Sequence, residues 1–279
     1  MKIRERRSAG SIISEIVGWI TAFVVFIMPL LFVLLNSLKD RKEANKLRFS
    51  LPSVFHWENY HEVIQNNHYE ILRAFRNSGL ITLLSLIVLV VASAMAGYVI
   101  QRRKSRLTGA ANKLLLVGLM VPVSMLPTIW LLQGLKIYKT MFSMVMIETA
   151  LNLPFTVMLY RGFMDTIPYE MEEAAWIDGC SKWAVFSRVI FPLLKPVTAT
   201  VIILNAVTIF NDFTNPLYFY PGAANVTVQL TIYNYISQFK SSYNLLFADV
   251  ILITVPMIIL FMIFNRRIIA GMVAGAVKG

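Results

Sequence analysis

The stretch NSGLITLLSLIVLVVASAMAGYVIQ, residues 77–101, contains no charged residue and is long enough to cross a lipid bilayer as a helix. A hydrocarbon layer of about 30 Å requires about 20 mostly apolar helical residues. The stretch lacks the polar–apolar alternation of a strand, and a helix satisfies its own backbone polar groups where no water is present. It therefore predicts a transmembrane helix.

Five further segments meet the same requirement, and none contains more than one acidic residue. Hydrophobic residues make up 57% of the 279 residues, charged residues make up 15%, and the mean hydropathy is +0.64. This composition is typical of a membrane protein. We therefore expect an all-α membrane protein with one domain and six transmembrane helices. The five further segments are 16–38, 114–135, 141–160, 197–218 and 245–265.

The net charge of +11 predicts an orientation in the membrane and not a nucleic-acid partner. Most basic residues fall in segments that face the cytoplasm if the N-terminus lies inside, including the loop 102–113. Both termini are therefore expected in the cytoplasm, although the first outer loop, 39–76, is itself basic. Cys180 is the only cysteine, so no disulfide within the chain and no thiolate metal site is expected.

The stretch MEEAAWIDG, residues 171–179, places acidic residues between two very apolar segments. Pro168 suits the first turn of a short helix, whose positive dipole end favours the acids. Gly179 suits the left-handed end of that helix, and Ser181 can cap a second one. The sequence therefore predicts a helix–glycine–helix elbow over 166–192 on the cytoplasmic face of the membrane.

The elbow resembles the EAA signature of binding-protein-dependent ABC importer permeases. That pattern reads E-A-A, three residues, G, nine residues and I-x-L-P, and here it runs from Glu173 through Gly179 to Pro192. The runs NSGLITLLS, LPFTVMLYRGFMDTIPYEMEEAAWIDG, FNDFTNPLYF and GMVAGAVKG are similar to the smaller, six-helix permease of maltose-type carbohydrate importers (MalG-like). Val189 and Phe191 replace the isoleucine and leucine of the signature, and Phe210 stands where relatives usually carry tryptophan.

This resemblance implies a type I ABC importer permease of the MetI-like fold, multi-pass in the bacterial cytoplasmic membrane. The implied partners are a second homologous permease, two ABC ATPase subunits, an extracytoplasmic solute-binding protein and the lipid bilayer. The implied substrate is a sugar or oligosaccharide, and the outer loop 219–244 resembles the loop that contacts the binding protein. The chain itself would hold no cofactor and catalyse no reaction, because its partners use ATP and Mg. An ABC permease for a non-sugar solute and an intramembrane enzyme are the alternatives.

The resemblance also implies which residues couple to the ATPases. The elbow would dock on an ATPase, with Glu173 contacting basic groups, and the tail 271–279 would form a second contact. The alternatives are an ordinary connecting helix and a frayed helix end. The expected coupling residues are Glu172, Glu173, Ala174, Ala175, Asp178, Gly179, Pro192, Gly275 and Lys278.

A polar stripe on the fifth predicted helix is the candidate substrate pathway. Asn205, Thr208, Asp212 and Asn215 follow the spacing i, i+3, i+7, i+10, which places them on one helix face. A charge within a bilayer usually faces a cavity or a partner. Hydrogen bonding between helices is the alternative role. The neighbouring Asn211, and the pair Glu148 and Asn152 on the fourth predicted helix, complete the candidate set.

Overall fold

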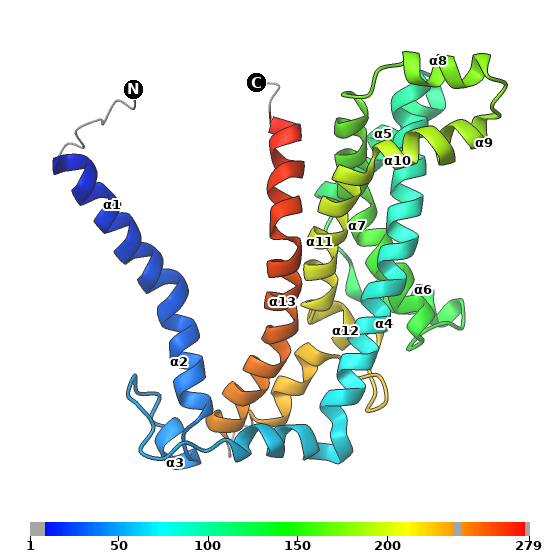
Figure 1. Cartoon of the computed structure of the whole chain (residues 1–279). Coiled ribbons are helices and arrows are strands. Elements are labelled where there is room, and N and C mark those ends of the chain that lie inside the picture. Colours follow the sequence, from blue (N-terminus) through cyan, green and yellow to red (C-terminus); the bar gives the residue numbers. More distant parts are fainter. Residues whose placement is uncertain (1–8, 237–240, 277–279) are drawn as a thin grey trace. The chain divides into compact units, whose positions relative to one another are not determined.

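The protein is helical in the computed structural model, which describes residues 9–236 and 241–276 (Figure 1). Its chain divides into two compact units, each described by itself. Unit 1 is formed by residues 1–69 and 231–255, and unit 2 by residues 70–230 and 256–279.

Unit 1 begins with a long helix made of three consecutive pieces. These are α1 (Ala9–Ala22), the π-helical η1 (Phe23–Ile27) and α2 (Met28–Ser37). Pro29 is the second residue of α2, two positions after the π-helical turn, and its missing N–H and bulky ring account for the local change of hydrogen-bond pattern. Unit 1 also contains α3 (Arg41–Ala44), the first turns of α4 (Glu58–Arg102), part of the 3-10 helix η3 (Val228–Asn234) and the start of α13 (Tyr243–Ala276).

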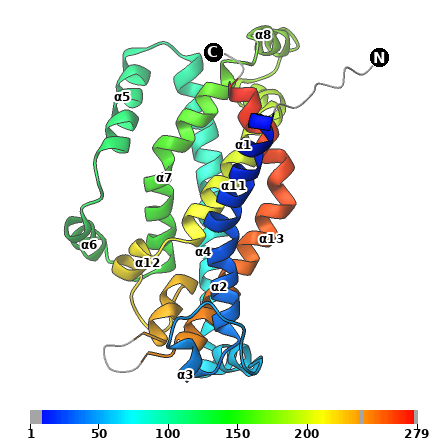
Figure 2. The same ribbon diagram turned by 90° about the vertical axis from the view of Figure 1, so that its left-hand side faces the viewer.

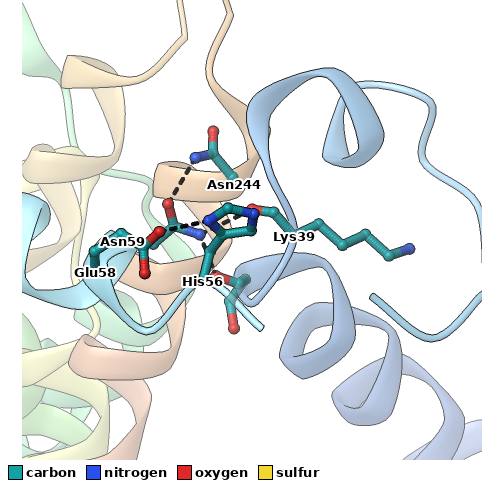
Figure 3. A network of polar contacts seen from close by, with 6 residues as sticks. Lys39, His56, Glu58, Asn59 and Asn244 are labelled. Carbon is teal, nitrogen blue, oxygen red and sulfur yellow. Dashed lines mark hydrogen bonds and ion pairs between the residues drawn. The ribbon is translucent and has the colours of Figure 1, made fainter. Parts of the chain in front are cut away.

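A network of polar contacts centred on Asn59 joins three segments of unit 1 (Figure 3). The Asn59 side-chain amide donates to the carbonyl oxygens of Ser37, at 2.8 Å, and Lys39, at 2.9 Å. Its Oδ1 accepts a hydrogen bond of 2.9 Å from Asn244. Lys39 is itself buried and donates to the carbonyl oxygen of Arg48, at 2.8 Å. The end of α2, the start of α4 and the start of α13 are thereby held together.

Unit 2 contains the rest of α4 and the helices that follow it. The dihedral angles of α4 leave the helical region at Asn66–Tyr69, so its long apolar part is a separate helix from Glu70. The other helices are α5 (Arg106–Met120), α6 (Met125–Gly134), α7 (Met141–Met164), α8 (Glu170–Ile177), α9 (Lys182–Ala184), the π-helical η2 (Val185–Ile190), α10 (Phe191–Leu193), α11 (Lys195–Phe210) and α12 (Thr214–Phe219).

The core of unit 2 packs α4 and α7 against the segment 167–201. Val90 and Ala94 of α4 and Tyr160 of α7 belong to one buried cluster with residues of α8, η2 and α11. Gly97 permits the close approach of α4 to α7, because a Cβ atom there would lie 3.1 Å from the Tyr160 Cβ. Figure 2 shows α5 and α7 running side by side in this unit.

The segment 114–135 differs from the single helix predicted for it, because the chain leaves the helical conformation between α5 and α6. Val121 precedes Pro122 and adopts an extended conformation, with φ −87° and ψ 118°. A residue before proline is disfavoured in the helical region, and the proline has no N–H for a helical bond. The break follows from these two effects.

The predicted fifth and sixth helices also differ in their ends. The structure ends α11 at Phe210, whereas the sequence predicted one helix over 197–218. The Asp212 Oδ1 accepts from the backbone N–H groups of Thr214, at 2.9 Å, and Asn215, at 3.3 Å, and this turn precedes α12. The last helix, α13, extends beyond the predicted 245–265 to Ala276.

Three helices in the described part of the chain are long and apolar enough to cross a membrane. They are Ser14–Ser37, Glu58–Arg102 and Met141–Met164. The helices Lys182–Leu193 and Lys195–Phe210, which meet at a bend of 72°, would form a fourth span as a pair. The apolar part of α13 within the described residues, Tyr243–Ile259, is shorter.

We predict that Asn59→Ala lowers the stability of unit 1 by about 1–3 kcal/mol, because buried partners lose their hydrogen bonds. The measurement is the midpoint of thermal unfolding of the purified protein in detergent. Gln65→Ala is the matched control, since Gln65 is an exposed residue of the same helical segment. An unfolding midpoint equal to that of the control would contradict the role given to Asn59.

Candidate functional site

The elbow consists of α8, a glycine turn and a second helical arm. The helix begins at Glu170, two residues after Pro168, and the carbonyl of Tyr169 accepts the N–H groups of Glu172, at 2.9 Å, and Glu173, at 3.1 Å. Gly179 has φ +80°, as predicted for a left-handed helix end. The Gly179 N–H donates to the carbonyl oxygen of Trp176, and the Cys180 N–H donates to the carbonyl oxygen of Ala175. This Schellman pattern satisfies the last carbonyls of α8.

The second arm of the elbow leads into α11. The Ser181 side chain accepts from the N–H of Ala184, at 3.3 Å, and so caps this arm as predicted. The arm is apolar on its inner side, where Phe186 and Ile190 are buried. Pro192 lies half-buried in α10, immediately before the bend of 72°.

A buried ion pair anchors α8 to the end of α4. Arg102 Nε and Glu172 Oε1 lie 2.6 Å apart, and only 9% and 1% of these side chains are exposed. The two atoms meet as an ion pair without hydrogen-bond geometry. The hydroxyl of Tyr98 donates to Glu172 Oε2, at 2.8 Å. The position of α8 on unit 2 therefore depends on a charge pair withdrawn from water.

Arg102 is held by three further contacts with the chain before α8. Its Nη2 donates to the carbonyl oxygen of Ile167, at 2.8 Å. Its guanidinium carbon lies 4.2 Å from the centre of the Tyr169 ring, and the Tyr169 hydroxyl donates to the Arg102 carbonyl, at 3.0 Å. Sequence reasoning missed Arg102, Tyr98 and Tyr169, because nothing in the sequence links Tyr98 and Arg102 to residues about 70 positions later.

The opposite face of α8 is exposed. Glu172 and Ala175 are three residues apart and buried, whereas Glu173, Ala174 and Ile177 are exposed, with 86% of Ile177 accessible. Asp178 and Gly179 are exposed as well. The structure therefore separates the expected coupling residues. Glu172 and Ala175 face the rest of unit 2. The other expected residues of α8 and its glycine turn lie with Ile177 on an exposed, partly apolar surface, which we call the α8 outer face (Glu173, Ala174, Ile177, Asp178 and Gly179).

The expected contact residues near the C-terminus are only partly described. Gly275 lies within α13. Lys278 lies outside the described residues, so the structure gives no account of its place.

Four of the expected pathway residues form one polar cluster. The Asn152 amide donates to the Glu148 carbonyl oxygen, at 2.8 Å, and to its carboxylate, at 3.5 Å. The Asn215 amide donates to Glu148 Oε1, at 3.4 Å. The Asp212 carboxyl group lies close to the Glu148 carboxyl group. The break after α11 thus brings Asp212 and Asn215 to Glu148, which is 1% exposed.

The other three expected pathway residues lie outside this cluster. Asn205 is buried and donates to Thr156 Oγ1, at 3.2 Å, which is a contact between α11 and α7. Thr208 is exposed and bonds the carbonyl of its own helix at Leu204. Asn211 accepts from the Gln229 amide, at 3.0 Å. The single stripe predicted for a continuous helix therefore does not form, because α11 ends at Phe210.

The segment after α12 is fastened to unit 2 through its backbone. The Asn77 amide donates to the carbonyl oxygens of Ala224 and Val226, both at 2.9 Å. Ser78 Oγ accepts from the N–H of Val228, at 3.0 Å. Residues of the NSGLITLLS run thus fix the first half of the expected outer loop 219–244.

Comparison with known proteins places this architecture in a family. Residues 88–273 match the family model of the binding-protein-dependent transport system inner membrane component. The chain belongs to this family. The matched residues include α7, the elbow, α11 and most of α13. They also include Arg102 and Glu172, the buried pair that anchors α8.

Relatives and a solved structure extend the likeness to almost the whole permease. The chain is 30% identical to the melibiose/raffinose/stachyose import permease protein MelC of Bacillus subtilis (strain 168), over 99% of this chain and 100% of that protein. It is 33% identical to the multiple sugar-binding transport system permease protein MsmG of Streptococcus mutans, over 91% and 93%.

A chain from the crystal structure of a bacterial ABC transporter involved in the import of the acidic polysaccharide alginate has the same fold. The TM-score is 0.80 at 16% identity, with 95% of this chain and 98% of that chain covered. The helical MetI-like permease fold is thus confirmed, and the protein is a transport component of the inner membrane and not an enzyme.

We predict that Glu172→Gln loosens α8, because it leaves the buried Arg102 charge uncompensated, a loss of about 3–5 kcal/mol. The measurement is backbone hydrogen exchange, which should accelerate across residues 170–180. Glu170→Gln removes an exposed charge from the same helix and should leave the exchange unchanged. Equal exchange in both variants would contradict the anchoring role.

We predict that Asp212→Leu and Asp212→Asn both reduce transport by the assembled importer without releasing its partners. Asp212 lies close to Glu148, which is sixteen residues from Met164 and hence about 24 Å along α7 from the elbow. The measurement is solute uptake together with the amount of copurified partner subunits. Thr208→Val is the control, because it removes an exposed hydroxyl group outside the polar cluster. Unchanged uptake in both Asp212 variants would show that the polar cluster serves packing only.

Proposed function

We propose that this permease forms half of the translocation pathway of an ATP-driven importer of sugars or oligosaccharides. Family membership supports the transport role. Relatives whose names specify sugars support the substrate class, among them MelC and the arabinooligosaccharides transport system permease protein AraQ of Halalkalibacterium halodurans. Six membrane spans with both termini in the cytoplasm are part of this proposal, supported by the apolar segments and the positive-inside charge bias.

The observation that carries the proposal is the α8 outer face mounted on a buried ion pair. An eight-residue helix is marginal by itself in water. Here Arg102 and Glu172 fix it to α4, while Glu173, Ala174 and Ile177 face outward with no other described element covering them. Alternating access in transporters is largely rigid-body movement. A small, firmly mounted and partly apolar surface suits the transfer of such movement from an ATPase subunit.

The partners follow from what the permease lacks and from its family. The sequence has no G-x-x-x-x-G-K-[ST] motif, so ATP and Mg would be bound by separate ATPase subunits. A second homologous permease, two ATPases and an extracytoplasmic binding protein would complete the importer. The segment fastened by Asn77 and Ser78 would present the surface for the binding protein.

The polar cluster of Glu148, Asn152, Asp212 and Asn215 is the proposed point of contact between this permease and its substrate. Planar carboxylate and amide groups are suited to hydroxyl-rich ligands, because they can donate and accept in a fixed plane. The cluster lies within unit 2, where α7 meets the turn after α11.

Reconstitution in lipid vesicles tests the function. The permease is combined with its partner permease, its ATPases and its binding protein, and a panel of oligosaccharides, amino acids and peptides is offered. ATP hydrolysis stimulated by the sugar-loaded binding protein, with uptake of that sugar, is the expected result. Stimulation by a non-sugar solute alone would reject the substrate class, and the absence of any stimulation would reject the transport role.

We predict that Glu173→Lys abolishes uptake, with a fall of more than about tenfold, because a like charge placed at a basic protein groove costs several kcal/mol. The variant should still insert into the membrane, since Glu173 is exposed and outside the buried anchor. Glu170→Lys is the control, because it makes the same charge reversal at an exposed position of the same helix. Normal uptake by the Glu173 variant would refute the coupling role of the α8 outer face.

A further inference from the structure

A basic cleft lies beside the elbow, where α4 ends and α5 begins. Its volume is about 530 Å³, and it is lined by the loop 103–106, by the first two turns of α5 and by Arg161 of α7. The ribbon shows this end of α5 at the same end of unit 2 as α8 (Figure 1). Its lining contains no residue of the α8 outer face or of the polar cluster around Glu148.

The lining is strongly cationic. Arg103, Lys104, Arg106 and Arg161 line the cleft, and no carboxylate does. Arg103, Lys104 and Arg106 are exposed, and none of them forms an ion pair with a described residue. Three uncompensated cations in one hollow favour an anionic ligand.

Arg161 is placed rigidly in the wall of the cleft. Its Nε donates to Gln101 Oε1, at 3.2 Å, and its Nη1 donates to Asn112 Oδ1. These two neutral partners orient the guanidinium without neutralising its charge. Arginine in a fixed orientation is suited to phosphate oxygens, which its planar fork can bind in pairs.

The N-terminus of α5 lies at the same hollow, because Ser105, Arg106 and Thr108 line it. Ser105 caps the helix and Thr108 completes a capping box, which satisfies the N–H of Thr108. The first two amides of α5, those of Arg106 and Leu107, have no acceptor within the helix. Backbone donors and the positive dipole end thus reinforce the side-chain charges.

An exposed apolar stripe continues from the cleft along α5. Asn112 lines the cleft, and Leu116, Leu119 and Met120 follow it at i+4, i+7 and i+8, on the same side of the helix. They are 41%, 45% and 83% exposed. In an inner membrane component, such a stripe is suited to contact with lipid acyl chains.

We propose that this cleft binds the phosphate headgroup of an anionic phospholipid whose acyl chains lie along α5. The charged hollow accounts for the headgroup, and the adjoining stripe accounts for the chains, which a free phosphate ion would not need. Cationic pockets at the ends of membrane helices bind anionic lipid headgroups in this way. The inference is independent of the sugar specificity proposed above.

The test is native mass spectrometry of the full-length chain purified in a neutral detergent with phosphatidylglycerol and phosphatidylcholine in equal amounts. The parent chain should retain phosphatidylglycerol in preference to phosphatidylcholine. In the double variant Arg103→Gln/Arg106→Gln, the retention of phosphatidylglycerol should fall about fivefold for each charge removed. Lys113→Gln is the matched control, because Lys113 is an exposed cation of α5 that does not line the cleft. Circular dichroism checks that all variants are folded.

A charge-preserving double variant, Arg103→Lys/Arg106→Lys, should keep most of the binding and separates a loss of charge from a loss of structure. Equal retention of the two lipids, or undiminished retention by the glutamine variant, would overturn the proposal. Displacement of the lipid by inorganic phosphate at equal concentration would show a site for free anions instead. Loss of the lipid on assembly with the partner subunits would show that protein covers the cleft, which also rejects the proposal.

Discussion

The ion pair between Arg102 and Glu172 is the constraint on which the α8 outer face, the proposed coupling surface of this permease, depends. It joins the last residue of α4 to the first turn of α8. Two buried charges persist only together, since removal of one leaves the other uncompensated. Tyr98 and Tyr169 complete the contacts of the pair. A force applied to α8 would therefore act on α4, whose apolar part extends through unit 2, instead of bending the connecting loop.

Much of the elbow could be predicted from the sequence, because its signals are local. Gly179 and Ser181 predicted the left-handed turn and the cap, and both are confirmed. The roles of Glu172 and Glu173 could not be separated in this way. Adjacent helix positions differ by about 100°, and only the location of Arg102 decides which carboxylate faces inward. That location depends on the packing of α4 against α7 at Gly97.

Helix ends were predicted less well than helix existence. The apolar segments 114–135 and 197–218 each become two helices, at Pro122 and at Asp212. A proline or an aspartate within an apolar run indicates only that a break can occur, since neighbouring helices can also accommodate a kink. In the second case the break assembles the polar cluster. It brings Asp212 and Asn215 to Glu148, a cluster that a continuous helix had not suggested.

The loop after α4 shows how one run of basic residues serves more than one purpose. The positive-inside rule treats Arg102, Arg103, Lys104 and Arg106 as a single group. In the structure, Arg102 turns inward to hold α8, while the other three line the basic cleft at the start of α5. The anchor of the proposed coupling surface and the proposed lipid site are thus consecutive in sequence. The predicted orientation in the membrane, the attachment of α8 and the proposed lipid contact all involve this one short segment.

The most direct measurement is the distance between spin labels on α4 and α8 through the ATP cycle of the assembled importer. Val99→Cys and Met171→Cys, in a Cys180→Ser chain, place the labels on exposed positions of the two helices, and Met171 lies outside the α8 outer face. If the buried pair makes α4 and α8 one rigid body, the distance distribution stays narrow and unchanged between the nucleotide-free and ATP-bound states. A distribution that shifts or broadens when ATP binds would contradict the account.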